Sequence, residues 1–180
     1  MRKKILFLAG MMACSSWAGA QEISKTWVAD KGNGTYQNPV LHADYSDPDI
    51  CAAGDDFYMT ASSFNCIPGI PILHSNDLVN WSLVNYALPV QEPEPFFDKA
   101  QHGKGVWAPA IRFHNGEFYI YWGDPDYGIY MIKTKDPKGK WSKPVLVKAG
   151  KGMIDATPLW DEDGKVYLIH AYAGSRSGVN

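Results

Sequence analysis

Two aspartates, Asp47 and Asp155, have the residue type and the setting that general acid–base chemistry requires. Each begins an apolar segment typical of a β-strand, and neither stands in a polar turn. We therefore expect both carboxyls to be partly buried. Burial beside a second carboxyl raises a carboxyl pKa, as acid–base catalysis near neutral pH requires. Hydrolysis of a glycosidic bond usually needs two carboxyls, one to donate a proton and one to activate water. The alternative is that each aspartate only caps a strand or binds backbone amides.

Other site chemistries find little support. Asp44, Asp47 and Asp49 lack the glycine and the bidentate glutamate of a calcium loop. The five histidines show no metal-ligand spacing, so no metal site is predicted. The sequence contains neither the Gly-Xaa-Ser-Xaa-Gly elbow of a serine hydrolase nor a phosphate-binding glycine loop.

The elements that must position these carboxyls are short strands. Aromatic and β-branched residues gather in runs separated by turn residues, and no window keeps apolar residues at a helical period. This pattern predicts an all-β chain. Asn115-Gly116 and Asp163-Gly164 each precede a run, as Gly54-Asp55 does, and such pairs favour hairpin turns. The runs that follow the turns are 57–60, 118–122 and 166–169.

The strands and turns recur in the same order along the chain. Three units lead from a proline-containing strand through a turn to a tyrosine: Pro48 to Tyr58, Pro109 to Tyr119 and Pro158 to Tyr167. The first two units also close alike, with Trp81 and Trp141. The register of the third unit is open by one or two residues, because Asp155 and Pro158 cannot both match the aspartate and the proline of the first unit.

Several antiparallel strands repeating every 50 to 60 residues or so predict a β-propeller. Chance similarity among short aromatic strands is the alternative, and the shared order of the pieces argues against it. The chain stops at Asn180, midway through the third unit, so about two and a half blades are expected. We expect an N-terminal fragment of a longer protein, or a truncated product that does not fold stably alone. Either would expose a strand edge and apolar surface.

The first twenty residues are predicted to be a signal peptide. A basic start at residues 2–4, an apolar run over 5–13 and the small residues Ala18-Gly19-Ala20 fit that role. We therefore expect a secreted or periplasmic protein, with 21–35 as a lead-in to a domain over 36–180. Lipid modification at Cys14 is the alternative, although Met11-Met12-Ala13 is a poor lipobox.

Charge and apolar content limit the binding partners that the sequence predicts, and the cysteines bear on disulfide formation. Without the signal, the 17 basic residues fall to 14 against 19 acidic ones, a charge of −5. No basic stripe predicts a nucleic-acid surface, and no second apolar segment is long enough to span a membrane. Cys51 and Cys66 could form a disulfide after export, but buried free thiols are the better interpretation.

Seven segments resemble glycoside hydrolase family 43. They occur in the family's order, and the resemblance extends from Tyr36 to the end of the chain. The segments are Tyr36–Val40, Ala43–Ile50, Tyr58–Phe64, His74–Trp81, Gly105–Pro109, Met153–Pro158 and Asp161–Tyr167.

The resemblance implies a five-bladed propeller that cleaves β-xylosides or α-L-arabinofuranosides with inversion. It implies that Asp47 is the general base, and that Asp155 tunes the pKa of the general acid and orients the sugar. Phe64, Trp107 and Ala108 would line the subsite of the cleaved sugar. Ordinary core packing is the alternative for both aromatic residues, and for Phe64 the two interpretations are nearly even. The expected substrate is a pentose-containing oligo- or polysaccharide. No cofactor is expected, and the resemblance allows a structural calcium ion in the full-length propeller.

The family's general acid is a glutamate on a later blade, so it would lie beyond Asn180. None of the glutamates present is predicted to lie on an inner strand, and this stretch alone is expected to be inactive. The third unit also has Asp155-Ala156 where the family often has Asp-Pro. A carbohydrate-binding propeller without catalysis is the alternative function. Such a protein would keep Phe64 and Trp107 but would not need two acids.

Overall fold

The computed structural model describes residues 26–65 and 67–177. The predicted signal peptide, Cys14, Cys66 and the first part of the lead-in lie outside the described residues. Within these ranges, no helix is long and apolar enough to cross a membrane. The helices α1 (Glu94–Phe97) and α2 (Gly174–Ser177) are single turns, and the rest of the regular structure is β.

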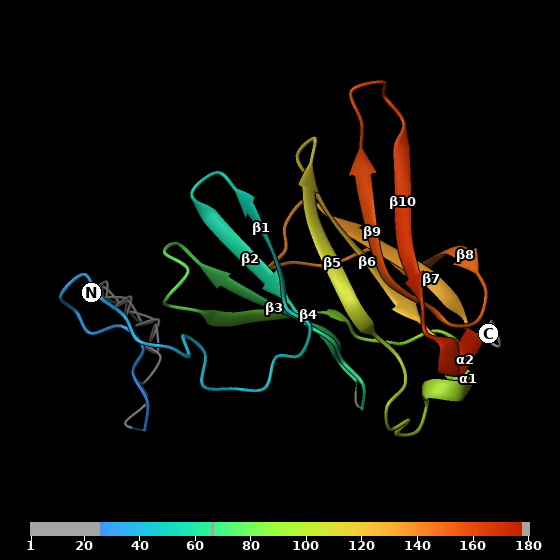
Figure 1. Ribbon diagram of the computed structural model, residues 1–180, viewed down its shortest axis with the longest axis horizontal. Coiled ribbons are helices and arrows are strands. Elements are labelled where there is room, and N and C mark those ends of the chain that lie inside the picture. The colour runs from blue at the N-terminus through green and yellow to red at the C-terminus, as the bar shows by residue number, and fades with distance from the viewer. Residues whose placement is uncertain (1–25, 66, 178–180) are drawn as a thin grey trace, which may run out of the picture.

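Two four-stranded antiparallel sheets follow each other along the chain, and a third sheet contains two strands (Figure 1). Each sheet is a meander in which neighbours in sequence are neighbours in space. The strands of the first sheet are β1 (Asp49–Ala53), β2 (Asp56–Thr60), β3 (Gly69–Ser75) and β4 (Ser82–Leu88). The second sheet consists of β5 (Trp107–His114), β6 (Glu117–Asp124), β7 (Gly128–Thr134) and β8 (Val145–Ala149). The third contains β9 (Met153–Trp160) and β10 (Val166–Tyr172).

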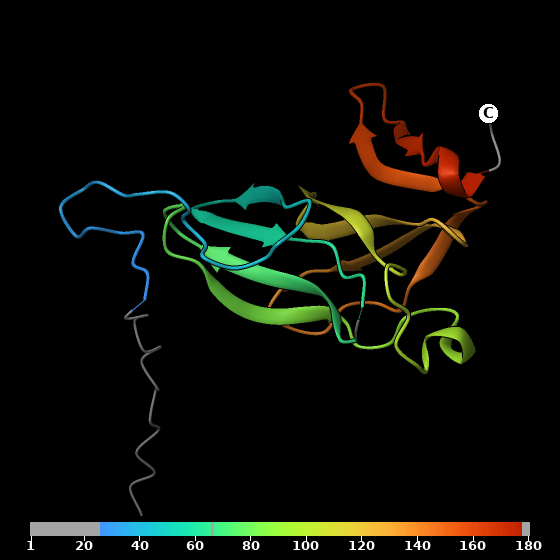
Figure 2. The ribbon, with the colours of Figure 1, turned by 60° about the horizontal axis from the view of Figure 1, so that its bottom comes forward.

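The first strands of the three sheets, β1, β5 and β9, pack side by side and form the inner strands of successive blades. In Figure 2 the molecule is rotated about the horizontal axis so that its bottom comes forward. In this view the third sheet forms a separate layer beside the second. The prediction of an all-β propeller with two and a half blades is therefore confirmed.

Pairing within the hairpins settles the register of the third unit. Tyr58 pairs with Cys51, Tyr119 with Arg112, and Tyr167 with Leu159. Each partner stands four residues after Asp47, Ala108 or Asp155, so these three positions are equivalent, and Pro158 corresponds to Ile50 and not to Pro48. The additional residue of the third unit lies in the turn between β9 and β10.

The closing tryptophans of the first two blades have the same local role. Trp81 and Trp141 stand just before the fourth strands β4 and β8. The indole Nε1 of Trp81 donates to the carbonyl of Leu78, and that of Trp141 to the carbonyl of Pro137. Each indole therefore closes the turn that leads into the outermost strand of its blade.

The main hydrophobic core lies between the first and second sheets. On β6 every second side chain, Phe118, Ile120 and Trp122, is buried, as the two-residue period of a strand requires. Ile70 on β3 and Ile111 on β5 belong to the same cluster. Burying one such side chain contributes about 1.5 to 3 kcal/mol. This packing holds the first two blades together and so fixes the relative positions of their inner strands.

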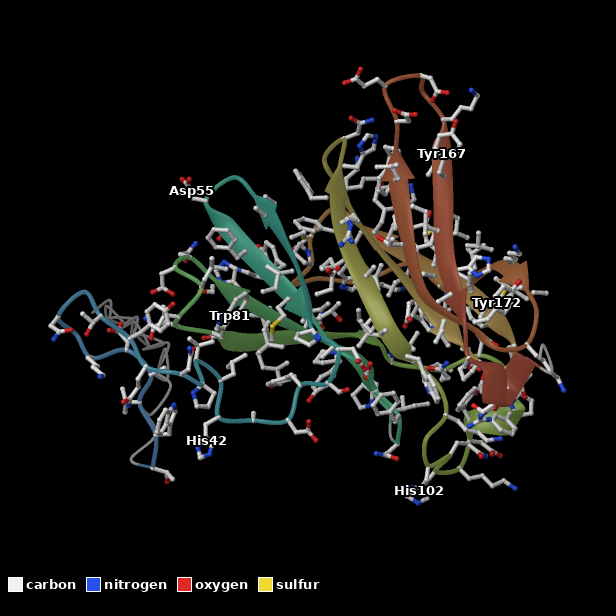
Figure 3. All side chains as sticks on the ribbon, in the orientation of Figure 1. His42, Asp55, Trp81, His102, Tyr167 and Tyr172 are labelled. Carbon is white, nitrogen blue, oxygen red and sulfur yellow. The ribbon has the colours of Figure 1, made fainter. Side chains whose placement is uncertain are left out.

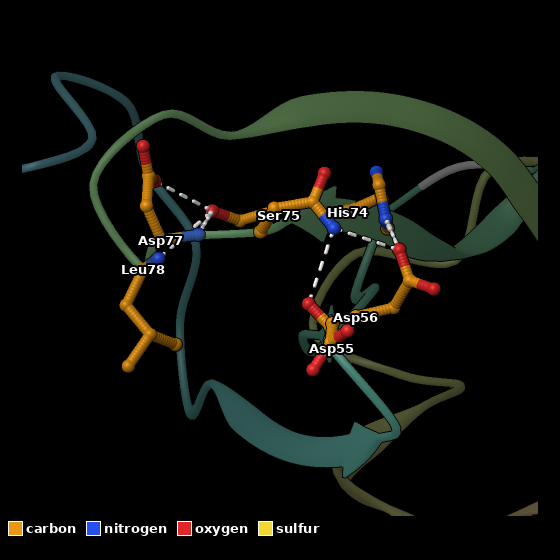
Figure 4. Close-up of polar contacts among 7 residues, drawn as sticks. Asp55, Asp56, His74, Ser75, Asp77 and Leu78 are labelled. Carbon is orange, nitrogen blue, oxygen red and sulfur yellow. Dashed lines mark hydrogen bonds and ion pairs between the residues drawn. The ribbon is translucent and has the colours of Figure 1, made fainter.

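Polar contacts fix the hairpin ends of the first blade (Figure 4). The Ser75 hydroxyl accepts the N–H groups of Asp77 and Leu78, while Asp56 accepts hydrogen bonds from His74 and Asn76. Hydrogen bonds from His74 and Asn76 lower the pKa of Asp56. This cluster lies at the end of β1 opposite Asp47, and its groups bond to one another, so it has a structural role.

The third sheet carries uncovered apolar side chains on both of its faces. Leu159, Val166, Tyr167, Ile169 and Tyr172 are all exposed large side chains on β9 and β10. Figure 3 labels the two tyrosines on β10. This is the exposed surface that the sequence predicted next to an incomplete blade.

Cys51 is a partly buried free thiol on β1. Burial, followed by the neighbouring Asp49 carboxylate, raises the pKa of Cys51 to about 12. The thiol therefore stays protonated and unreactive near neutral pH.

Candidate active site

Three equivalent residues at the beginnings of the inner strands have left-handed backbone conformations. The φ angles are 50° for Asp47, 37° for Ala108 and 55° for Asp155. Such angles are uncommon outside glycine and cost about 1 to 2 kcal/mol per residue. Because β1, β5 and β9 pack side by side, the three residues lie around one axis.

These residues open into a single pit. A cavity of about 480 Å³ is lined by Asp47, Phe64, Asn65, Gly103, Trp107, Ala108 and Asp155. All five residues predicted for the site therefore meet in one place, although more than a hundred positions separate the two aspartates. A second cavity of about 250 Å³ also touches Asp47, Ala108 and Asp155 and continues along the inner strands.

Asn65 and Gly103 were not predicted from the sequence. The N–H of Gly103 donates to Asn65 Oδ1 at 3.3 Å, which joins the loop after β2 to the loop before β5. Asn65 stands among apolar residues and Gly103 in a polar loop, and neither belongs to a motif that pointed to the pit.

Asp47 is held by hydroxyl groups. Ser46 Oγ and Ser62 Oγ donate to Asp47 Oδ2 at 2.8 and 2.7 Å. Its Oδ1 accepts no hydrogen bond from another described residue. Because no described backbone N–H bonds this carboxylate, the alternative that Asp47 only caps the backbone is not supported.

The Asp155 carboxylate makes no hydrogen bond or ion pair with another described residue, although its backbone is tightly placed. Gly123 on β6 lies directly against β9. A Cβ atom at this glycine would stand 2.5 Å from the carbonyl oxygen of Met153 and 2.7 Å from Cα of Ile154. Only glycine allows this approach, so the strand that carries Asp155 is set by close backbone packing.

The expectation that both aspartates are partly buried is wrong, since each has an exposed side chain. Next to Asp155, Met153 and Ala156 are buried as the apolar sequence suggested, whereas Ile50, close to Asp47, is 44% exposed. The left-handed residues at the strand starts face the open pit, whereas Met153 and Ala156 beside Asp155 enter the core.

An aromatic wall bounds the pit. The rings of Phe64 and Trp107 meet edge to face, with centroids 5.9 Å apart at 87°. The Arg176 guanidinium lies over the Trp107 ring at 5.8 Å and donates to Asp126 Oδ1 at 3.0 Å. Both aromatic side chains are half-buried, so they present surface to the pit while they pack against the protein.

A network around Arg112 joins the three inner strands close to the left-handed residues. The Arg112 guanidinium on β5 donates to Asp49 on β1 and, at 2.9 Å, to Thr157 Oγ1 on β9. The N–H of Ile111 also donates to Asp49 Oδ2, at 2.7 Å. The planar fork of arginine suits such a three-way contact. The network therefore fixes the strand starts relative to one another.

No glutamate lines the pit among the described residues. Glu117 instead accepts hydrogen bonds from Lys133 and Tyr119, and these contacts lower the pKa of Glu117. In residues 26–65 and 67–177, no three His, Cys, Asp or Glu side chains are grouped so as to hold a metal ion.

The fold and the pit define a β-propeller with an axial cavity bounded by two carboxylates and an aromatic wall. The sequence signature of glycosyl hydrolases family 43 matches residues 36–180. The chain belongs to this family, as the resemblance of its motifs predicted.

Comparison with individual proteins agrees with this assignment. The chain is 36% identical, over 96% of its length, to a beta-xylosidase of Formosa agariphila. It is 38% identical, over 75% of its length, to a non-reducing end alpha-L-arabinofuranosidase of Bacteroides ovatus. The crystal structure of the family 43 protein BlXynB from Bacillus licheniformis matches 76% of the chain with a TM-score of 0.66 and 33% identity.

The chain covers only part of these proteins. It spans 31% and 26% of the two curated relatives and 29% of the BlXynB chain.

Proposed function

We propose that the whole protein hydrolyses pentose-containing glycans, with β-xylosides and α-L-arabinofuranosides as the substrate class, by inversion. The observation that carries this proposal is the meeting of Asp47 and Asp155 in one pit beside Phe64 and Trp107. The names of the two relatives, a beta-xylosidase and an arabinofuranosidase, support this substrate class.

Asp47 is the general base in this proposal. Both serine hydroxyls bond its Oδ2, so Oδ1 is the atom left to accept a proton from water. Inversion is a single displacement. The water oxygen bonds to the anomeric carbon as the bond to the leaving oxygen breaks, Asp47 takes the water proton, and a general acid protonates the leaving oxygen. That acid would come from a part of the protein outside the described residues.

Asp155 orients the sugar and tunes the pKa of the general acid. Its carboxylate has no described protein partner, so it is available to accept hydroxyl hydrogen bonds from a bound ring. A negative charge near a second carboxyl raises the pKa of that carboxyl, which keeps an acid protonated at neutral pH.

The aromatic wall and Ala108 receive the apolar face of the ring. Sugar C–H groups pack on aromatic rings, while the hydroxyl groups reach polar side chains. Ala108 occupies the position equivalent to the two aspartates, and its small methyl group leaves room for the ring.

The test uses the whole protein with nitrophenyl β-D-xyloside and nitrophenyl α-L-arabinofuranoside. We expect hydrolysis of at least one of them, an inverted first product by NMR, and a loss of kcat of about 10²- to 10⁴-fold in Asp47→Ala, because general base catalysis supplies a rate factor of that size. Asp155→Asn should also lose most activity. Asp44→Asn, at an exposed aspartate outside the pit, is the control. Binding of xylo-oligosaccharides without turnover would instead support a carbohydrate-binding propeller, and turnover that survives Asp47→Ala would refute the assignment of the base.

A further inference from the structure

We propose that Ser62 is a positioning residue that orients the general base Asp47 and links it to the second blade. This inference rests on the function proposed above. Ser62 stands in the segment after β2, between the starts of β1 and β5. The roles proposed for the pit residues do not include it.

The direction of its hydroxyl group follows from its two partners. The N–H of Ala108 can only donate, and it reaches Ser62 Oγ at 2.9 Å. The serine oxygen therefore accepts there, and its hydrogen is left to donate to Asp47 Oδ2 at 2.7 Å. One side chain thus joins two of the three left-handed residues of the pit.

The backbone of Ser62 is also fixed from both sides. Its N–H donates to the carbonyl of Ser46 at 3.0 Å. The next residue, Ser63, exchanges two backbone hydrogen bonds with Val106, at 3.0 and 3.2 Å. The hydroxyl group is consequently presented to Asp47 by a segment that is itself anchored to the first and second blades.

Two effects follow for the proposed reaction. Donation to Oδ2 restricts rotation of the Asp47 carboxylate and leaves Oδ1 for the attacking water. The bond from Ala108 also ties the wall of the pit to the same hydroxyl. Without this hydroxyl, Asp47 would keep only the adjacent Ser46 as a described donor, and its carboxylate would sample more orientations.

Ser63 provides a matched control. Its hydroxyl also accepts the N–H of a left-handed residue, Ile70, at 2.8 Å, and Ile70 has a φ of 55°. Ser63 Oγ makes no hydrogen bond to Asp47. The two serines therefore hold strained backbone in the same way, and only Ser62 also reaches the base.

The experiment compares Ser62→Ala, Ser62→Thr and Ser63→Ala in the whole protein on the pentoside that the parent hydrolyses. A hydrogen bond to a charged group changes an equilibrium by about 10- to 100-fold, and we expect Ser62→Ala to lower kcat by such a factor with KM little changed. Ser62→Thr should recover most of the loss, because it keeps the hydroxyl group. Ser63→Ala should lower thermal stability and leave kcat near the parent value.

Two further measurements separate positioning from general damage. The loss in Ser62→Ala should be the same for good and poor leaving groups, since the base acts on water and not on the leaving oxygen. The substitution should also cost little in an Asp47→Ala background, as coupling between contacting residues requires.

The inference is overturned if Ser62→Ala keeps kcat within about threefold of the parent, well below the expected effect. A threonine variant as slow as the alanine variant, or an undiminished effect in Asp47→Ala, would overturn it too. A parent protein that hydrolyses no pentoside, or an Asp47→Ala variant with full activity, would instead mark failure of the proposed function itself.

Discussion

Asp124 at the end of β6 should make stability depend on pH in a way that a single substitution removes. Its side chain is fully buried. Oδ1 accepts the N–H of Asp126 at 3.0 Å, and Oδ2 is buried with no partner among the described residues. Burial raises the pKa of Asp124 from 3.8 to about 6. The perturbation is Asp124→Asn, which keeps an oxygen for the Asp126 N–H and cannot ionise.

The direction of the change in stability with pH follows from the number of protons that each state binds. Between pH 3.8 and about 6 the native carboxyl holds its proton while the unfolded one has lost it. The native state then binds more protons, so the free energy of unfolding falls as pH rises through this window. A difference of roughly two between the two pKa values corresponds to about 3 kcal/mol. The penalty is therefore absent well below pH 4 and complete above about pH 7, at the neutral pH where the carboxyl is ionised.

The assay is urea and thermal unfolding of the whole protein at pH 4 and pH 7.5. The parent should lose about 2.5 kcal/mol more than Asp124→Asn on going from pH 4 to pH 7.5, because a small part of the penalty is already present at pH 4. Any constant cost of the unpaired asparagine amide cancels in this comparison. Asp44→Asn, at an exposed aspartate, should retain the parent's dependence. If Asp124→Asn loses stability with pH as steeply as the parent does, burial of this carboxyl is not the cause.

Two other predictions test how the inner strands are held. Gly123→Ala should push β9 away from β6, because its Cβ would stand 2.5 Å from the Met153 carbonyl oxygen. We expect a lower melting temperature and a fall in kcat of about tenfold or more, as small displacements at catalytic groups commonly cause; an unchanged kcat would contradict the placement of Asp155. Arg112→Met should lower the free energy of unfolding in urea by about 1 to 2 kcal/mol after allowance for solvent screening of its pair with Asp49, and equal stability would show that the network contributes nothing.

Local sequence features were sufficient to predict most of the fold. The strands after Asn115-Gly116 and Asp163-Gly164 form where hairpin turns predicted them, because these residues tolerate the backbone that a tight turn needs. The repeated tyrosines were sufficient to reveal the blades. The extra residue of the third unit could not be placed, because a longer turn between β9 and β10 and a shifted strand leave the same spacing in the sequence.

The residues of the candidate site could be predicted from the sequence, but the contacts that hold them in place could not. Asp47 and Asp155 could be chosen because each begins an apolar strand segment and stands in a segment that resembles family 43. The bond from Ser62 to Asp47 and the contact of Arg112 with Thr157 join side chains from different segments or different blades. Neither contact leaves a periodic trace in the sequence. Exposure of the two aspartates was also missed, since apolar neighbours report on the strand and not on a left-handed residue at its start.

The left-handed residues explain why the stabilising contacts of Ser62, Arg112 and Gly123 lie close to the pit. Asp47, Ala108 and Asp155 each adopt a costly conformation, and such strain persists only where the surroundings over-determine the backbone. The bond from the Ala108 N–H to Ser62, the network of Arg112 and the close approach of Gly123 to β9 supply those constraints. Two of the three residues carry the carboxylates, so the contacts that hold the strained backbone also hold the carboxylates toward one cavity. Loosening any of these contacts should therefore impair the geometry of the pit before it unfolds the blades.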